Sequence, residues 1–172
     1  MHHKIKIAII AVVMMLCAGF YSAPYFTVLA MKSAADAKDA EKLSSYVNFP
    51  ALKENLKGTF NAKVASEATK QENPFAALGA AMAAAFINPM VDAFVTPESL
   101  AMMMKGDKPQ AGKSADASKS SDRDVDIHMA YESFDRFVVT VKKKDSNDAP
   151  VGLVFRREGL LSWKLAALRL PM

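Results

Sequence analysis

Residues 125–143 read VDIHMAYESFDRFVVTVKK, and apolar side chains alternate with polar ones on both sides of a short central turn. Such alternation predicts two half-buried β-strands. The same period of two returns in residues 151–156 and 161–167, with Glu158-Gly159 as a predicted tight turn between them. Four runs with short connections predict a four-stranded antiparallel meander in which one face of the sheet is covered.

Trp163 belongs to the fourth run, where it alternates in phase with Leu161, Leu165 and Ala167. Because side chains two residues apart lie on the same side of a strand, we expect all four on the covered face. Trp163 is therefore predicted to lie in the core between the sheet and the helices. His128 alternates with the apolar residues of the first run, so it is expected to face solvent.

Helical signals fill the chain before the strands: capping Asn or Thr residues precede prolines, and apolar residues recur at four-residue spacing. Pro24 is predicted to begin a new helix, and Pro89 to break another one near Asn88, because proline removes a backbone donor. Helices followed by strands predict an α+β domain with the helices packed on the sheet. The predicted helices cover residues 25–40, 39–46, 51–71, 74–91 and 97–105.

The predicted boundaries divide the chain into four parts, of which the third has a distinct composition. Residues 106–124 are rich in Lys, Ser, Asp and Ala and contain no large apolar residue. They are expected to form a flexible low-complexity loop, because they have nothing to bury. The other parts are a membrane anchor in residues 1–26, the helical part of a soluble domain in residues 27–105, and a sheet in residues 125–172 that completes the same domain.

The N-terminal part has no charged side chain from Ile7 to Met31, a run of 25 residues. About 20 apolar residues suffice for a helix to cross a bilayer. A cleaved signal peptide is the alternative, but Tyr21-Ser22-Ala23 is a poor cleavage site because an aromatic residue stands first and Pro24 follows the cut. An uncleaved transmembrane helix over about residues 5–24 is therefore favoured.

The charge distribution predicts how this helix is oriented. Lys4 and Lys6 precede the helix, and positive residues stay on the cytoplasmic side. In a Gram-negative cell the expected location is then the inner membrane, crossed once, with the C-terminal domain in the periplasm. Without these two lysines the chain carries 20 basic and 18 acidic residues, and no basic face is evident, so no nucleic-acid partner is expected.

Several segments together resemble a bacterial family known as domain of unknown function 2939. The segments are residues 21–25, 37–43, 47–52, 95–98, 131–137, 163–165 and 169–171. They span most of the chain outside residues 106–124. Asn48 stands where Asp is expected in that family, which argues against a role for a charge there. The resemblance implies a bacterial envelope protein and implies no activity.

The residues that enzymes use for chemistry are sparse. Cys17 is the only cysteine and falls within the anchor, and His128 is the only histidine beyond the N-terminus. No zinc spacing, phosphate-binding loop, dinucleotide fingerprint or nucleophile elbow is present. Glu132 and Asp135 are better read as solvated, or as paired with Arg136, than as an acid–base pair. We therefore expect a protein that is not an enzyme, with no catalytic residues, metal ligands or cofactor.

Two non-enzymatic functions remain open. In the first, the domain binds another protein of the cell envelope while its anchor holds it in the membrane. In the second, it binds a lipid-like ligand between the uncharged, Ala-rich helix of residues 74–91 and the aromatic face of the sheet. The residues expected to line that second site are Phe75, Leu78, Met82, Phe86, Tyr131 and Trp163.

Two further features can each be interpreted in two ways, as structural or as in contact with the membrane. The helix of residues 74–91 is apolar all round, so it must be buried in protein or touch lipid, and a second membrane span is its alternative. The basic residues at 142–144 and 156–157 lead into turns. They are expected to protect strand edges, with a contact to anionic lipid headgroups as the alternative.

Overall fold

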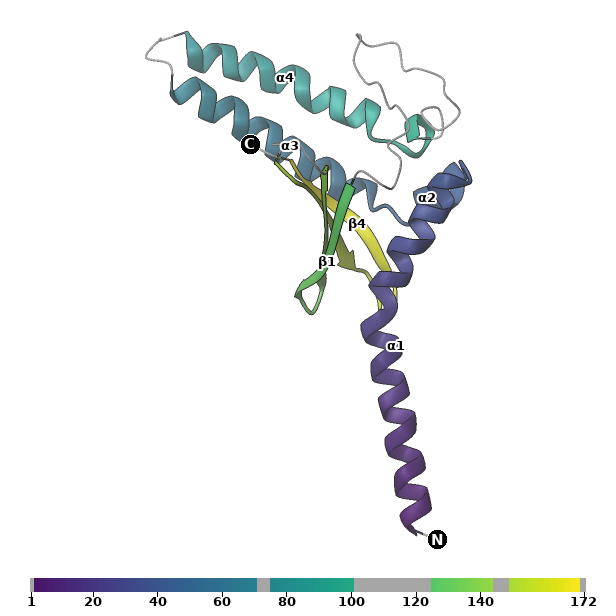
Figure 1. Cartoon of the computed structure of the whole chain (residues 1–172). Helices are drawn as coiled ribbons and strands as arrows, with labels where there is room; N and C mark the ends of the chain where they lie inside the picture. Colours follow the sequence, from purple (N-terminus) through teal and green to yellow (C-terminus); the bar gives the residue numbers. More distant parts are fainter. Residues whose placement is uncertain (1, 71–74, 101–124, 144–148, 171–172) are drawn as a thin grey trace.

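The computed structural model describes residues 2–70, 75–100, 125–143 and 149–170. The chain folds as an α+β protein, with helices first and a sheet at the C-terminal end, as predicted (Figure 1). The elements are α1 (His2–Asp36), α2 (Ala40–Ser45), α3 (Phe49–Thr69), α4 (Ala76–Phe94), β1 (Val125–Ser133), β2 (Arg136–Lys143), β3 (Val151–Arg157) and β4 (Trp163–Arg169).

The four strands form one antiparallel sheet in the order β1-β2-β3-β4, which confirms the predicted meander. Tyr131 pairs with Phe137, Phe137 with Phe155, and Phe155 with Leu165. This row places large apolar side chains at the same level of every strand, and the helices cover that face. The chain between α2 and α3 touches the edge of the sheet, where Val47 forms an isolated parallel bridge with Leu165 of β4.

The register of β4 corrects one sequence expectation. Ala167 was expected on the covered face, but β4 contains a bulge, so that Val154 pairs with Ala167 while the next residue, Phe155, pairs with Leu165. The extra residue, Ala166, shifts the alternation by one. Leu168 therefore packs against the core in place of Ala167.

The connection between β3 and β4 is also longer than the predicted Glu158-Gly159 turn. It runs from residue 158 to residue 162, and the Glu158 N–H donates to the Ser162 carbonyl. Leu161 consequently lies outside β4 and is 60% exposed, so its predicted place on the covered face was wrong.

The core lies between the sheet and the helices α1, α3 and α4. The side chains of Phe137, Phe155 and Trp163 are at most 1% exposed, which confirms the predicted position of Trp163. Leu52 and Leu56 contribute from the first half of α3. Apolar area removed from water is the main favourable term in folding, so these residues carry much of the stability.

Helix α1 is continuous through Pro24, where a break was predicted. The Pro24 ring is fully buried, so its packing against the domain offsets the lost backbone hydrogen bond. One turn earlier, the Tyr21 carbonyl accepts a hydrogen bond of 2.8 Å from the Tyr131 hydroxyl. After this point α1 packs against the core through Tyr25 and Val28 among others, whereas residues 9–19 are all exposed.

Helices α3 and α4 form an antiparallel pair above the sheet (Figure 1). Asn48 caps α3, since its Oδ1 accepts from the Ala51 N–H at 2.9 Å. The predicted break at Pro89 is absent, and α4 runs on to Phe94. Val91, just beyond the proline, is 4% exposed, so packing against α3 holds this last part of α4 in line.

Some expectations lie outside the described residues. A helical turn begins at Pro97, and the Thr96 Oγ1 accepts from the Ser99 N–H at 3.1 Å, in agreement with the predicted cap. The predicted continuation of this helix over residues 101–105 is not among the described residues. The same holds for the loop of residues 106–124 and for the Asn73-Pro74 start of α4.

Candidate functional site

The predicted ligand site is split into two separate halves. The four predicted side chains of α4 and its N-cap, Phe75, point outward: Phe75 and Phe86 are each 73% exposed, while Leu78 and Met82 are 59% and 57% exposed. Helix α3 contacts both α4 and β4 and lies between α4 and the sheet (Figure 1). The α4 side chains therefore do not meet the sheet face, and the structure does not assemble the predicted cleft.

The sheet half of the predicted site is packed with aromatic rings. The ring centroids of Tyr131 and Trp163 lie 5.8 Å apart, in an edge-to-face arrangement. Tyr25 of α1 lies over Phe137 at 4.7 Å, also edge to face. These geometries are favourable for aromatic pairs. Trp163 is 1% exposed, so it takes part in the core and is closed to a ligand.

Helix α4 presents its other side to α3. Ile87 and Val91 pack against the core, and Lys57 of α3 forms an ion pair of 2.8 Å with Asp92. Asn61 donates a hydrogen bond of 3.0 Å to Asn88. One side of α4 is thus fixed to the domain, while an apolar stripe on the other side faces outward. We call this stripe the α4 face; its members are Phe75, Leu78, Met82, Phe86 and Met90.

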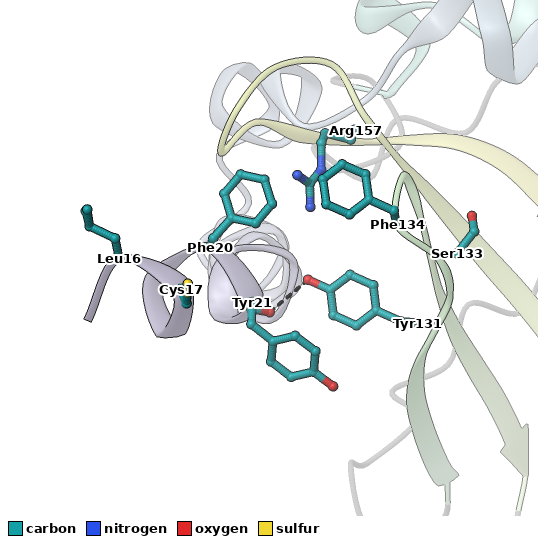
Figure 2. Close-up of a pocket in the computed structure, with 8 residues that line it drawn as sticks. All are labelled: Leu16, Cys17, Phe20, Tyr21, Tyr131, Ser133, Phe134 and Arg157. Carbon is teal, nitrogen blue, oxygen red and sulfur yellow. Dashed lines mark hydrogen bonds between the residues drawn. The ribbon is translucent and has the colours of Figure 1, made fainter. Parts of the chain in front are cut away.

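An open apolar pocket of about 530 Å³ lies where α1 leaves the domain (Figure 2). Of the six predicted ligand residues, Tyr131 alone lines it. Burial raises the pKa of Tyr131 above its ordinary value of 10.0, and its hydroxyl donates a hydrogen bond to the Tyr21 carbonyl. The lining residues are Leu16, Cys17, Phe20, Tyr21, Tyr131, Ser133, Phe134 and Arg157.

Arg157 holds this junction together. Its guanidinium carbon lies 4.0 Å from the Phe20 ring centroid and 4.2 Å from that of Phe134, so it is held between rings from α1 and from the β1–β2 turn (Figure 2). The Trp163 ring lies at 4.7 Å. Such cation–π contacts are favourable, and more so when water is excluded. The Arg157 Nε is buried without a hydrogen-bond partner among the described residues.

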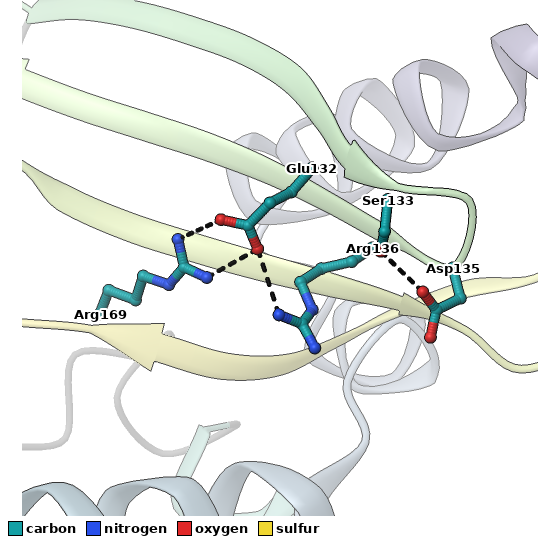
Figure 3. A network of polar contacts seen from close by, with 5 residues as sticks. All are labelled: Glu132, Ser133, Asp135, Arg136 and Arg169. Carbon is teal, nitrogen blue, oxygen red and sulfur yellow. Dashed lines mark hydrogen bonds and ion pairs between the residues drawn. The ribbon is translucent and has the colours of Figure 1, made fainter.

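A network of charged side chains lies on the other face of the sheet (Figure 3). Arg169 donates from Nη1 to Oε1 and from Nη2 to Oε2 of Glu132, each at 2.7 Å. Arg136 adds a longer contact of 3.3 Å. Because β1 and β4 are the two edges of the sheet, the Glu132–Arg169 pair links its outermost strands. Sequence reasoning found Arg136 as a partner but missed Arg169, since no local pattern connects residues 37 apart.

The hydrogen bonds from Arg169 and Arg136 hold the pKa of Glu132 below its ordinary value of 4.5. The folded state thus favours the ionised carboxylate, and the pair stabilises the fold above about pH 4.5 and loses that contribution as the pH falls further. We expect Glu132→Gln to lower the melting temperature at pH 7, with the difference from the parent shrinking toward pH 3. Thermal unfolding at several pH values measures this.

The matched control for this prediction is Glu54→Gln, which removes the same charge from an exposed position of α3. Its melting temperature should differ little from that of the parent across the same pH range. A Glu132→Gln difference that stays constant from pH 7 to pH 3 would show that the ionised pair is not its origin.

The described residues contain no group of three or more His, Cys, Asp or Glu side chains that could hold a metal ion. His128 is exposed, as the sequence predicted. The features that stand out are two outward-facing apolar surfaces, the α4 face and the pocket at the junction of α1. Sequence reasoning identified the residues of the first as core or ligand contacts, because an apolar stripe does not reveal whether its partner belongs to the same chain.

The comparison with protein families gave a match. A protein-family model described as "Protein of unknown function (DUF2939)" matches residues 13–103, which include most of α1 and all of α2, α3 and α4. No curated protein and no solved structure matches the chain significantly.

Proposed function

The chain belongs to the DUF2939 family of proteins of unknown function, and from this premise we propose that it is a membrane-anchored module that binds another protein of the cell envelope. In this proposal α1 holds the domain at the membrane and the α4 face is the binding surface. The protein acts by binding and not by catalysis.

The α4 face is the observation that carries the proposal. Its large side chains are between 52% and 73% exposed, although they form one continuous stripe on a well-defined helix. Large contiguous apolar patches are uncommon on monomeric soluble proteins and mark interaction sites when they occur. An amphipathic groove on a partner could take side chains at this helical spacing.

The place of α4 in the fold favours a protein partner over the membrane that α1 enters. Helix α4 lies at the end of the molecule away from the N-terminus of α1 (Figure 1). It is long and apolar enough to be a candidate membrane span. Such a span would carry the Lys57–Asp92 pair and the Lys53 contact with the Asp92 carbonyl toward lipid. Charged groups are costly there, so a protein-facing role suits the helix better.

The orientation of the domain is the second part of the proposal. Helix α1 is long and apolar enough to cross a membrane. Lys4 and Lys6 at its N-terminal end favour the cytoplasm for that end, and this supports a bacterial inner-membrane protein whose domain lies in the periplasm. A partner in the envelope then meets the α4 face on the periplasmic side.

Paired charge substitutions test the binding role. Leu78→Asp combined with Phe86→Asp should weaken binding of the partner at least about tenfold, because central apolar contacts dominate interface energies. The fold should change little, since both side chains are exposed and surface substitutions usually cost within about 0.5 kcal/mol. Crosslinking in membranes, followed by mass spectrometry of the captured proteins, measures the binding, and thermal unfolding measures the stability.

The matched control is Ala62→Asp combined with Ala65→Asp, which adds the same two charges to exposed positions of α3. The control should capture the same protein as the parent. If the α4 variant is folded and still captures that protein as well as the control does, the α4 face is not the binding surface.

A further inference from the structure

The second outward-facing surface lies at the end of the sheet where α1 leaves the domain. Two turns meet there, one between β1 and β2 and one between β3 and β4. The Arg157 N–H donates to the Asp135 carbonyl at 3.0 Å and so joins them. We call this surface the hairpin tips. Its exposed apolar members are Phe134, 72% exposed, Leu160, 82% exposed, and Leu161, 60% exposed.

The length of the part of α1 that precedes its contact with the domain sets the distance between the hairpin tips and the bilayer. From Lys6 to Phe20, where contact with the domain begins, the helix rises by about 21 Å. The hydrocarbon core of a bilayer is about 30 Å thick. The charge-free helix below the domain is thus roughly 9 Å too short to cross the bilayer by itself. Lys6 can snorkel toward the headgroups and shorten this gap, but Phe20 still reaches no further than the outer boundary of the bilayer.

The hairpin tips lie at the same level as Phe20. The ring centroids of Phe20 and Phe134 are 5.7 Å apart, and the Arg157 guanidinium lies against both rings. Figure 1 shows the β1–β2 turn on the side of the sheet from which the N-terminal half of α1 extends. If α1 crosses the membrane, the tips must touch the outer leaflet of that membrane.

We infer that the hairpin tips dock on the phospholipid surface of the membrane that α1 spans, with Phe134, Leu160 and Leu161 at the headgroup boundary. The bilayer is the occupant because the tips continue the lipid-facing surface of α1. Tyr21 and Tyr131 stack at 4.9 Å beside them, and aromatic side chains favour this boundary. The anchor therefore has two parts, a spanning helix and a pair of turns that fix the tilt of the domain.

Charged neighbours set the depth of this docking. Hydrogen bonds from Ser133 and from the backbone hold the pKa of Asp135 below its ordinary value of 3.8, so its carboxylate is ionised at neutral pH. Glu158 is paired with Lys164 at 3.1 Å. Ionised groups are costly in hydrocarbon, so the tips stay among the headgroups. Arg157 lies at the same level, and a guanidinium is a side chain that pairs well with phosphate groups.

Fluorescence quenching in vesicles tests the docking of the full-length chain. In a Cys17→Ser background, Phe134→Cys or Leu160→Cys is labelled with an environment-sensitive fluorophore, and the protein is inserted into vesicles of phosphatidylethanolamine and phosphatidylglycerol. Ala149→Cys is the control, because it is exposed at the opposite end of the sheet. We expect quenching by nitroxide lipids to be several-fold stronger at positions 134 and 160 than at 149, with protection from aqueous iodide.

Two results would overturn the inference. Equal lipid quenching at all three positions, with free access of iodide, would place the tips in water. Protection from iodide without lipid quenching would mean that a protein, such as a second copy of this chain, covers the tips. Neither result depends on the α4 face, so the two proposals are tested separately.

Discussion

Removal of the whole of α1, residues 1–36, is expected to unfold the domain, whereas removal of residues 1–18 alone is expected to leave it folded. The second half of α1 is part of the core: Pro24 is fully buried, Ala34 is 1% exposed, and Tyr25, Val28 and Met31 pack against the core cluster. The first half is exposed wherever its side chains are described.

The size of this effect follows from the area that α1 covers. Uncovering a large apolar side chain costs about 1.5–3 kcal/mol, and deleting α1 would remove several such chains and expose the core residues that they touch, Phe137 among them. The sum reaches the roughly 5–15 kcal/mol that holds a typical domain together. Circular dichroism and thermal unfolding of the two fragments measure the difference.

A cooperative unfolding transition in residues 37–172 would contradict this account of α1. It would mean that the sheet and α3 suffice for folding and that α1 only tethers them. The shorter deletion serves as the control, because it removes most of the candidate span but retains Phe20 and its contact with Arg157.

Trp163→Ala is expected to produce the second large effect, a loss of about 3–5 kcal/mol in the free energy of unfolding. Trp163 is 1% exposed and contacts the rings of Tyr131 and Phe137 from the first position of β4. Its removal leaves a cavity and also takes one ring away from the Arg157 guanidinium. Chemical denaturation followed by circular dichroism measures the loss, since Trp163 is the only tryptophan and fluorescence would vanish with it.

Two comparisons make the Trp163 result specific. Trp163→Phe should cost less than Trp163→Ala, because it keeps a ring and removes an indole Nε1 that is buried without a partner among the described residues. Leu161→Ala, two residues away and 60% exposed, should change stability little. A Trp163→Ala variant as stable as the Leu161→Ala variant would mean that Trp163 does not support the core.

The sheet could be predicted from sequence because each strand is buried on one face only, so apolar and polar residues alternate along it. Trp163 and Leu165 occupy the predicted face for this reason. The bulge at Ala166 could not be predicted, because an extra residue in one strand is visible only beside its partner strand. The capping signal at Thr96, before Pro97, is equally local, and its side chain accepts the expected backbone hydrogen bond from Ser99.

At two prolines, tertiary packing outweighed the local preference of proline for a helix boundary. Pro24 and Pro89 each predicted a helix boundary, yet both lie inside continuous helices. Pro24 is itself fully buried, and Val91, two residues after Pro89, is 4% exposed, so packing against the domain holds both helices continuous through their prolines. A rule based on one missing hydrogen bond cannot weigh this tertiary contribution.

The candidate site was the least predictable part, because its chemistry depends on contacts between distant segments. The α4 stripe was correctly identified as one face, but periodicity cannot say that α3 would separate it from the sheet. Similarly, nothing near Arg157 in the sequence indicates that Phe20, from α1, would lie against its guanidinium. Long-range packing decides both arrangements, and both emerge only when the chain is folded.

The central claim is that the α4 face binds another protein, and site-specific photocrosslinking in intact cells tests it most directly. A photoreactive phenylalanine analogue is placed at Phe86, which is 73% exposed, or at Ala62 of α3 as the control. We predict a discrete protein adduct after irradiation at position 86, absent at position 62 and lost when Leu78→Asp is added. Adducts to lipid alone at position 86, or no adduct in cells that contain the folded protein, would contradict the claim.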